Sequence, residues 1–179
     1  YDHMNKHTLC TMVQLNKANA EVGHKVAMQV AAMKPVALDE SSVPQEVKDE
    51  EYKVAVQKTK EEQVEKAVAA AIKKAGYNAY IAESEEHLEE GIRKGNITEE
   101  DAAAIRELKA KTAEEKSANL PEQMVQNIAN GRMKKFYKES CLLNQEYIQD
   151  SKQTVAEYLK STDKDLTVTA FKRFTLRAE

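Results

Sequence analysis

Residues that interrupt regular secondary structure are scarce in this sequence. It contains five glycines and three prolines in 179 residues, and it has no tryptophan. Because glycine and proline commonly end helices and strands, their scarcity predicts long uninterrupted elements, mainly helices. Charged residues make up 32% of the chain, against roughly 25% in an average globular protein. The length is that of one domain, with room for an appendage.

An excess of positive charge is also lacking. The formal net charge is −3, which argues against general binding of nucleic acids or of anionic membranes, because such proteins usually carry net positive charge. No apolar run approaches the ~18 residues of a membrane-spanning helix. No charged and then apolar leader precedes Tyr1. We therefore expect a cytoplasmic protein, and a piece of a longer one.

The arrangements that carry covalent or metal chemistry are missing as well. No nucleophile–base pattern, glycine-rich phosphate loop or metal-ligand spacing occurs. Cys10 and Cys141 are far apart without a CxxC spacing, which predicts two reduced cysteines in the core. His3 and His7 are four residues apart, but no cysteine or carboxylate completes a ligand set. We expect no enzyme activity, no cofactor and no metal, and interpret the chain as a binding module.

Alternating stretches near the two ends predict strands. In "TLCTMVQL", residues 8–15, Leu9, Thr11, Val13 and Leu15 fall on one face. In "LTVTAFKRFTL", residues 166–176, alternation predicts one buried face made of Leu166, Val168, Ala170, Phe174 and Leu176. Strands at both ends with helices between them predict an α+β fold, in which a small antiparallel sheet packs with helices. We assign residues 1–43 and 120–179 to this core subdomain.

A helix is predicted over "NAEVGHKVAMQVAAMKP". Asn19 is a suitable N-cap, and Pro35 would stop the helix. Valines and a methionine at helical spacing should face the core, beside a stripe of small residues that lets another backbone approach closely. The core-facing residues are Val22, Val26, Val30 and Met33, and the small ones are Gly23, Ala27 and Ala31.

Residues 44–119 predict a long, projecting antiparallel helical hairpin of the coiled-coil kind. Glutamate, lysine, glutamine and alanine dominate it, and a narrow apolar seam suits a helix that touches one partner helix. Its tip should lie near residues 77–97, where Gly95 supplies a helix stop and Thr98 and Asp101 can form a capping box. A hairpin contacts mainly itself, so deleting residues 60–117 should leave the core folded.

The stretch "GRMKKFYKESCLLNQ", residues 131–145, is the most chemically individual passage. Gly131 lies inside a predicted helix, which suggests a neighbouring backbone pressed against it. Arg132, Lys135 and Lys138 form one basic flank. This flank either holds the phosphates of an RNA or is a solvated rim whose aliphatic stems cover core residues.

The segment "NGRMKKFYKESCLLNQEYI" strongly resembles the C-terminal part of the core in the elongation factor Ts family, whose members exchange guanine nucleotides on elongation factor Tu. "YDH", "HKVAMQVAAMKP", "VPQEVKDEEY", "SKQTVAEYL" and "VTAFKRFTL" agree with the family in the same order. The similarity covers residues 1–59 and 118–179, and residues 60–117 resemble a lengthening of the family's hairpin.

The resemblance implies a docking surface for elongation factor Tu, in its GDP-bound and nucleotide-free states. Tyr147, Ile148 and Gln149 match a region of the family that contacts this partner. His3, rather than Asn5 or His7, matches a histidine that contacts the partner's third domain. Binding the nucleotide-free state more tightly lowers GDP affinity by the same factor, without covalent chemistry.

Two departures from the family limit what this chain is expected to do. The family's N-terminal half is absent, including the "TDFV" segment whose Asp and Phe disturb the partner's magnesium site, and no Asp here precedes Phe. We therefore expect docking without exchange. The alternative is a structural or dimerisation module that pairs two copies through the core and the hairpin face of Ala102, Ile105 and Leu108.

Overall fold

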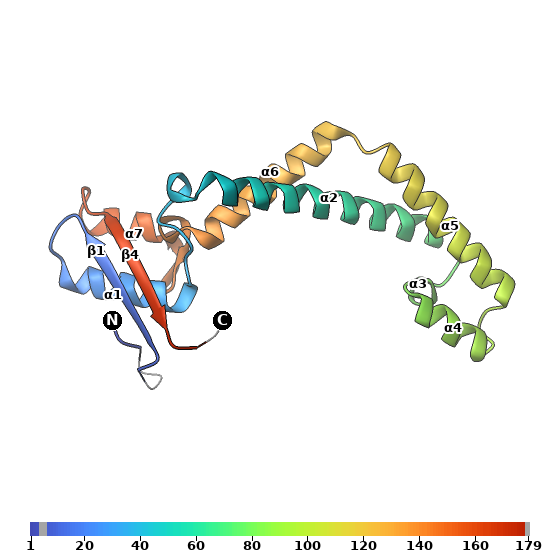
Figure 1. Cartoon of the computed structure of the whole chain (residues 1–179), viewed down its shortest axis with the longest axis horizontal. Helices are drawn as coiled ribbons and strands as arrows, with labels where there is room; N and C mark the ends of the chain where they lie inside the picture. The colour runs from blue at the N-terminus through green and yellow to red at the C-terminus, as the bar shows by residue number, and fades with distance from the viewer. Residues whose placement is uncertain (4–6, 178–179) are drawn as a thin grey trace. The chain divides into compact units, whose positions relative to one another are not determined.

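The computed structural model describes residues 1–3 and 7–177. Its helices and strands follow one another along the chain (Figure 1) as β1 (Leu9–Leu15), α1 (Ala20–Met33), α2 (Gln45–Lys74), α3 (Ala79–Ala82), α4 (Glu85–Arg93), α5 (Glu99–Ala118), α6 (Glu122–Ser140), β2 (Glu146–Tyr147), β3 (Asp150–Thr154), α7 (Val155–Thr162) and β4 (Val168–Thr175). Two short 3₁₀ turns, Glu40–Ser42 and Leu142–Asn144, precede α2 and β2. The predicted α+β class is confirmed, because long helices accompany two antiparallel strand pairs, β1–β4 and β2–β3.

The chain forms two compact units. Unit 1 comprises Tyr1–Glu51 and Gly131–Glu179, and unit 2 comprises Tyr52–Asn130. The divisions fall inside α2 and α6, whereas the sequence suggested boundaries at the ends of residues 44–119. Whether that segment is dispensable for folding of the core stays a prediction.

Unit 1 contains the sheet formed by the two ends of the chain. β1 and β4 lie antiparallel, with Val13 opposite Phe171 and Thr11 opposite Arg173 (Figure 1). The inner face of β1 is the predicted one: Thr11 is buried, and Val13 and Leu15 are partly buried against the core. This face packs on α1, where the Thr11 hydroxyl donates a 2.7 Å hydrogen bond to the carbonyl of Ala27.

The predicted buried face of β4 is wrong beyond Val168. Val168 is buried, but Phe174 is 50% exposed and Leu176 is 84% exposed, while Phe171 packs against the core. The reason is a register shift between Gln14 and Leu15, which pair with Ala170 and Val168 respectively. One extra residue in β4 reverses which side chains face inward, because side chains in a strand alternate.

The outer face of the same sheet explains a second error. Cys10 lies opposite Phe174 and is exposed, so it is not a core cysteine. Cys141 is buried as predicted. Burial raises the pKa of the Cys141 thiol, which keeps it protonated and unreactive.

Helix α1 begins and ends where its sequence indicates. The Asn19 side chain accepts a hydrogen bond from the Val22 amide, and Lys34 closes the helix in the left-handed conformation before Pro35. The small-residue stripe faces β1, since Leu15 lies 3.6 Å from where a Cβ of Gly23 would stand. Met33 was expected in the core, but it is 44% exposed at the last turn.

The core of unit 1 joins segments that are distant in the sequence. The three valines predicted to face inward from α1 are buried, and they pack with residues from beyond position 140. This cluster consists of Val22, Val26, Val30, Leu142, Tyr147, Val155, Leu159, Leu166 and Val168. A smaller cluster of Ala37, Val43 and Cys141 adjoins Phe136 and Tyr137.

Unit 2 has a core of its own, in which α3 and α4 pack with α2 and α5. Its buried residues are Ile72, Ala82, Leu88, Ala102 and Ile105, with Leu108 and several isoleucines packed around them. The predicted helix signals are confirmed: Gly95 has a positive φ of 73° after α4, and Thr98 and Asp101 form a capping box at α5. Because Ala102 and Ile105 are buried and Leu108 packs with them inside unit 2, this face is not open for pairing two copies.

The crowded glycine is not the predicted one. Gly131 lies in α6, but a Cβ placed there meets no atom of the described residues within 4 Å beyond its own helix and neighbours. The inference of a backbone pressed against Gly131 is therefore wrong. Gly91 in α4 is the crowded position, where a Cβ would lie 3.1 Å from Ile97 Cγ1 and 3.2 Å from Ile81 Cγ2. A glycine inside a helix can mark close packing, but the sequence does not distinguish the crowded Gly91 from the uncrowded Gly131.

Candidate partner-binding site

The β2–β3 hairpin carries three of the four predicted contact residues. β2 is only Glu146–Tyr147, and its pairing with β3 shifts register between these two residues. Such a short pair is marginal on its own. The turn that contains Ile148 and Gln149 must therefore be fixed by contacts from outside the hairpin.

Two buried glutamines provide those contacts. Gln29 of α1 is fully buried; its Nε2 donates to the Glu146 carbonyl at 3.0 Å, and its Oε1 accepts from the Ile148 amide at 2.8 Å. Gln145 Nε2 donates to the carbonyls of Met33 at 3.3 Å and Glu139 at 2.9 Å. The two amides also meet at 3.3 Å. A buried polar network with its partners in place holds one geometry, so α1 and the end of α6 set the position of the turn.

Tyr147 anchors the hairpin from the core side. It is 4% exposed, and its ring stacks on Tyr158 of α7 with centroids 4.1 Å apart. Burial, followed by a hydrogen bond with Tyr158, raises the pKa of the Tyr147 phenol well above its ordinary value. The phenol therefore stays protonated near neutral pH, and it donates to Gln149 Oε1 at 3.2 Å. Its ring is turned away from solvent, so Tyr147 can shape a docking surface more readily than touch a partner.

The exposed turn of the β2–β3 hairpin presents one apolar and one polar side chain next to each other. Ile148 is 40% exposed although its backbone amide is held by Gln29, and Gln149 is exposed beside it. Met33 and Val36 are also exposed apolar residues, 44% and 65% respectively, in the segment that Gln145 and Ser140 tie to the end of α6. An exposed isoleucine on a fixed backbone is suited to insert into a partner's pocket with little loss of entropy.

His3 lies in the N-terminal segment of unit 1, outside the helices and strands. Its backbone amide donates to the Leu9 carbonyl at 2.9 Å, which places residues 1–3 alongside β1. Its exposed ring has Nδ1 3.0 Å from the Tyr1 hydroxyl, and Tyr1 in turn packs edge-on against His24 of α1. These described contacts do not reach the β2–β3 turn. Of the two alternatives to His3, Asn5 lies outside the described residues, and His7 is paired with Asp2.

The basic flank of α6 has acidic neighbours. Lys135 lies 3.8 Å from Glu139, and Lys138 lies 3.2 Å from Glu146. Pairs of this kind favour the interpretation as a solvated rim over a phosphate site. Within the described ranges, no three histidine, cysteine or acidic side chains lie close enough together to hold a metal ion. Among the same residues, none of the helices combines the length and the hydrophobicity that spanning a bilayer requires.

Sequence reasoning missed the two buried glutamines, and only one of them carries a local signal. Gln29 stands between Met28 and Val30 on an apolar helix, and that uncharged polar residue at a core position is the one local signal of a buried network. Gln145 is preceded by polar Asn144 and followed by Glu146, so nothing local marks it as buried. Its role depends on a partner more than a hundred residues away.

Comparison with known proteins agrees with the resemblance and extends it. The family model described as Elongation factor TS matches residues 1–85 and 89–178. This match includes most of the segment 60–117, which is therefore more family-like than the quoted segments suggested. The observed fold and the match cover the same two units.

Three relatives show how similarity is distributed. The chain is 57% identical over 180 aligned residues to Elongation factor Ts of Bacteroides fragilis strain ATCC 25285, covering all of this chain and 54% of the relative. It is 55% identical over 179 residues to that of Parabacteroides distasonis, again with 54% of the relative covered. It is 30% identical over 172 residues to that of Porphyromonas gingivalis strain W83, with 42% of the relative covered. The chain thus spans about half the length of these relatives, and it belongs to the elongation factor Ts family.

Proposed function

We propose that this chain binds elongation factor Tu, in both its GDP-bound and nucleotide-free states, through the β2–β3 turn and the N-terminal segment that bears His3. The chain acts in the cytoplasm as a non-enzymatic docking module. The observation that carries the proposal is the exposed Ile148 on a backbone fixed by buried Gln29. A preformed surface of this kind loses little conformational freedom on binding.

Docking and exchange are separable in this proposal. Affinity that is equal for both nucleotide states shifts no equilibrium between them. Exchange requires groups that favour the nucleotide-free state, and the Asp–Phe pair of the family's exchange segment does not occur in this sequence. The chain therefore adds affinity and leaves the partner's nucleotide release near its intrinsic rate.

The test mixes the 179-residue chain with elongation factor Tu carrying a fluorescent GDP analogue. We expect a complex on a sizing column, together with slow release of the analogue. Ile148→Ala should weaken the complex about five- to thirtyfold, as for an interface residue that contributes 1–2 kcal/mol. His3→Ala should weaken it less, because its ring is exposed on the N-terminal segment, apart from the β2–β3 turn.

His87→Ala in unit 2 is the control. Its ring stacks on Tyr80 and bonds only within unit 2 among the described contacts, so the affinity for elongation factor Tu should not change. Rapid release of the analogue by the chain alone would contradict the separation of docking from exchange. Equal loss of affinity in the Ile148 and His87 variants would contradict the placement of the docking surface.

A further inference from the structure

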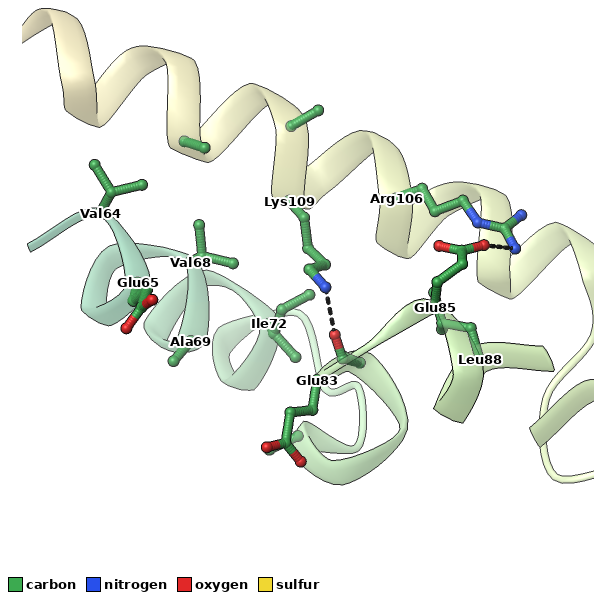
Figure 2. Close-up of a pocket in the computed structure, with 14 residues that line it drawn as sticks. Val64, Glu65, Val68, Ala69, Ile72, Glu83, Glu85, Leu88, Arg106 and Lys109 are labelled. Carbon is green, nitrogen blue, oxygen red and sulfur yellow. Dashed lines mark hydrogen bonds and ion pairs between the residues drawn. The ribbon is translucent and has the colours of Figure 1, made fainter. Parts of the chain in front are cut away.

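Unit 2 contains a groove that its own core leaves unfilled. The groove has a volume of about 820 Å³ and is bordered by α2, α3, α4 and α5. Figure 2 shows Val64 and Val68 reaching from α2 toward α5, with Ile72 and Leu88 further along. All the lining residues belong to unit 2, so the groove does not depend on the rest of the chain.

The dimensions of the groove suit a helix. Its α5 wall runs from Arg106 to Ala113 and its α2 wall from Val64 to Ile72; at 1.5 Å per residue each wall is about 10–12 Å long, or roughly two helical turns. Both walls expose alanines, namely Ala69 on α2 and Ala110 on α5. Small side chains let another backbone approach, and a hollow two turns long accepts anchors at positions i, i+3, i+4 and i+7.

The charges at the groove indicate the sign of its occupant. The two cations are already engaged: Arg106 pairs with Glu85, and Lys109 Nζ donates to the Ala82 carbonyl at 2.7 Å (Figure 2). The carboxylates of Glu65 and Glu83 are exposed at the border, although Glu83 Oε2 also lies 3.7 Å from His87 Nδ1. The adjoining residues 83–101 carry eight acidic side chains against Arg93 and Lys94.

We propose that this groove binds an amphipathic helix of another protein, with apolar side chains inserted between α2 and α5 and basic side chains toward Glu65 and Glu83. A second copy of this chain fits less well, because the border and the net charge are both acidic and like charges repel. The site is separate from the proposed docking surface in unit 1, so either proposal can fail alone.

The experiment uses the full chain and a synthetic helix as the probe. The probe is a fluorescein-labelled, amidated peptide of leucine, alanine and lysine, with leucines at i, i+3, i+4 and i+7. Comparison peptides replace every lysine with glutamate or scramble the order of residues. Fluorescence anisotropy should show saturable binding of one basic peptide per chain, weakened by added salt, with much weaker binding of both comparison peptides.

Matched variants locate the binding. Ala110→Leu fills the groove and should lower the affinity about tenfold or more, as expected when an anchor loses its pocket. Ala104→Leu, which is exposed on the same helix but outside the groove, should leave affinity within about twofold. Glu65→Lys should weaken binding about three- to fivefold, and Glu107→Lys, exposed outside the groove, much less. Circular dichroism of each variant checks that the helices persist.

Three results would overturn the proposal. One is no saturable binding of the basic peptide, and another is equal binding of the acidic one. The third is self-association of the chain that Ala110→Leu abolishes, because a second copy would then be the occupant.

Discussion

The two units build their cores in opposite ways. In unit 1, valines of α1 pack with residues beyond position 140, such as Leu159. In unit 2, the hydrophobic cluster lies between Ile72 and Ile105, and two of its five buried residues are alanines. The contrast teaches that the cluster of unit 2 joins residues close in sequence, whereas unit 1 is specified by contacts that no short window contains. Unit 2 also has an open groove beside its cluster, while unit 1 has two clusters, one large and one small.

The largest expected effect comes from removing most of unit 2. Deleting residues 60–117 and joining Thr59 to Asn119 through a short turn should remove the helical signal of that unit. The core of unit 1 lies wholly outside the deleted span, so it should still melt cooperatively. Circular dichroism and tyrosine fluorescence during heating would measure this. If the tyrosine transition disappeared, the two units would not be independent.

Core truncations should act on one unit at a time. Leu159→Ala and Ile105→Ala each remove a side chain that is 1% exposed, at a cost of about 2–5 kcal/mol. Amide hydrogen exchange followed by mass spectrometry should show faster exchange in unit 1 for the first variant and in unit 2 for the second. Leu176→Ala, at an 84% exposed position, is the control. Faster amide exchange in both units from either truncation would contradict the independence of the two cores.

Removing the buried amide should loosen the docking turn. Gln29→Leu leaves the Ile148 amide and the Glu146 carbonyl without the partner that they have in the structure. Leaving buried polar groups unpaired costs about 1–3 kcal/mol. We expect a lower melting temperature and faster exchange of the Ile148 amide. Gln149→Leu, exposed on the same turn, should leave that exchange rate nearly unchanged; an unchanged rate in Gln29→Leu would mean that the network does not fix the turn.

The two helical glycines should respond to alanine with opposite signs. Gly131→Ala adds a methyl group in open space and should stabilise the chain by up to about 1 kcal/mol through helix propensity. Gly91→Ala places a methyl group against Ile97 and Ile81, and overpacking of this kind costs about 1–3 kcal/mol. Thermal melts of both variants make the comparison. If both alanine variants were more stable, Ile81 and Ile97 would be able to move aside for the added methyl group at little cost.

The smallest effect is electrostatic and pH-dependent. The Asp165 amide and Lys17 together lower the pKa of Asp163 below its ordinary value. Because the folded pKa lies below the unfolded one, the stabilisation is complete above the unfolded pKa and is lost as the pH falls through the folded one. Asp163→Asn should therefore weaken the acid dependence of the melting temperature of unit 1 as the pH falls below the ordinary pKa of an aspartate. An identical pH profile in the variant would show that other carboxylates govern it.

Prediction from sequence succeeded where the physical cause is local. Asn19, Gly95 and the Thr98–Asp101 box act within a few residues of themselves, so their roles are readable from the sequence. The inward face of β4 was not readable, because the register shift that reverses it is set by pairing with Gln14 and Leu15. Burial of Gln145 likewise depends on Gln29 across the fold.

The pairing of β1 with β4 has a consequence for synthesis of the chain. Leu15 and Val168 are neighbours in the sheet, so about 150 residues must be made before β1 finds its partner. The hydrophobic cluster of unit 2 lies between Ile72 and Ile105, so all of it is made during that interval, whereas β1 remains an unpaired strand. Closing so long a loop is slow, and a waiting strand with alternating apolar residues is a template for pairing with other chains. The period before β4 emerges is therefore when a nascent chain of this protein most needs a chaperone.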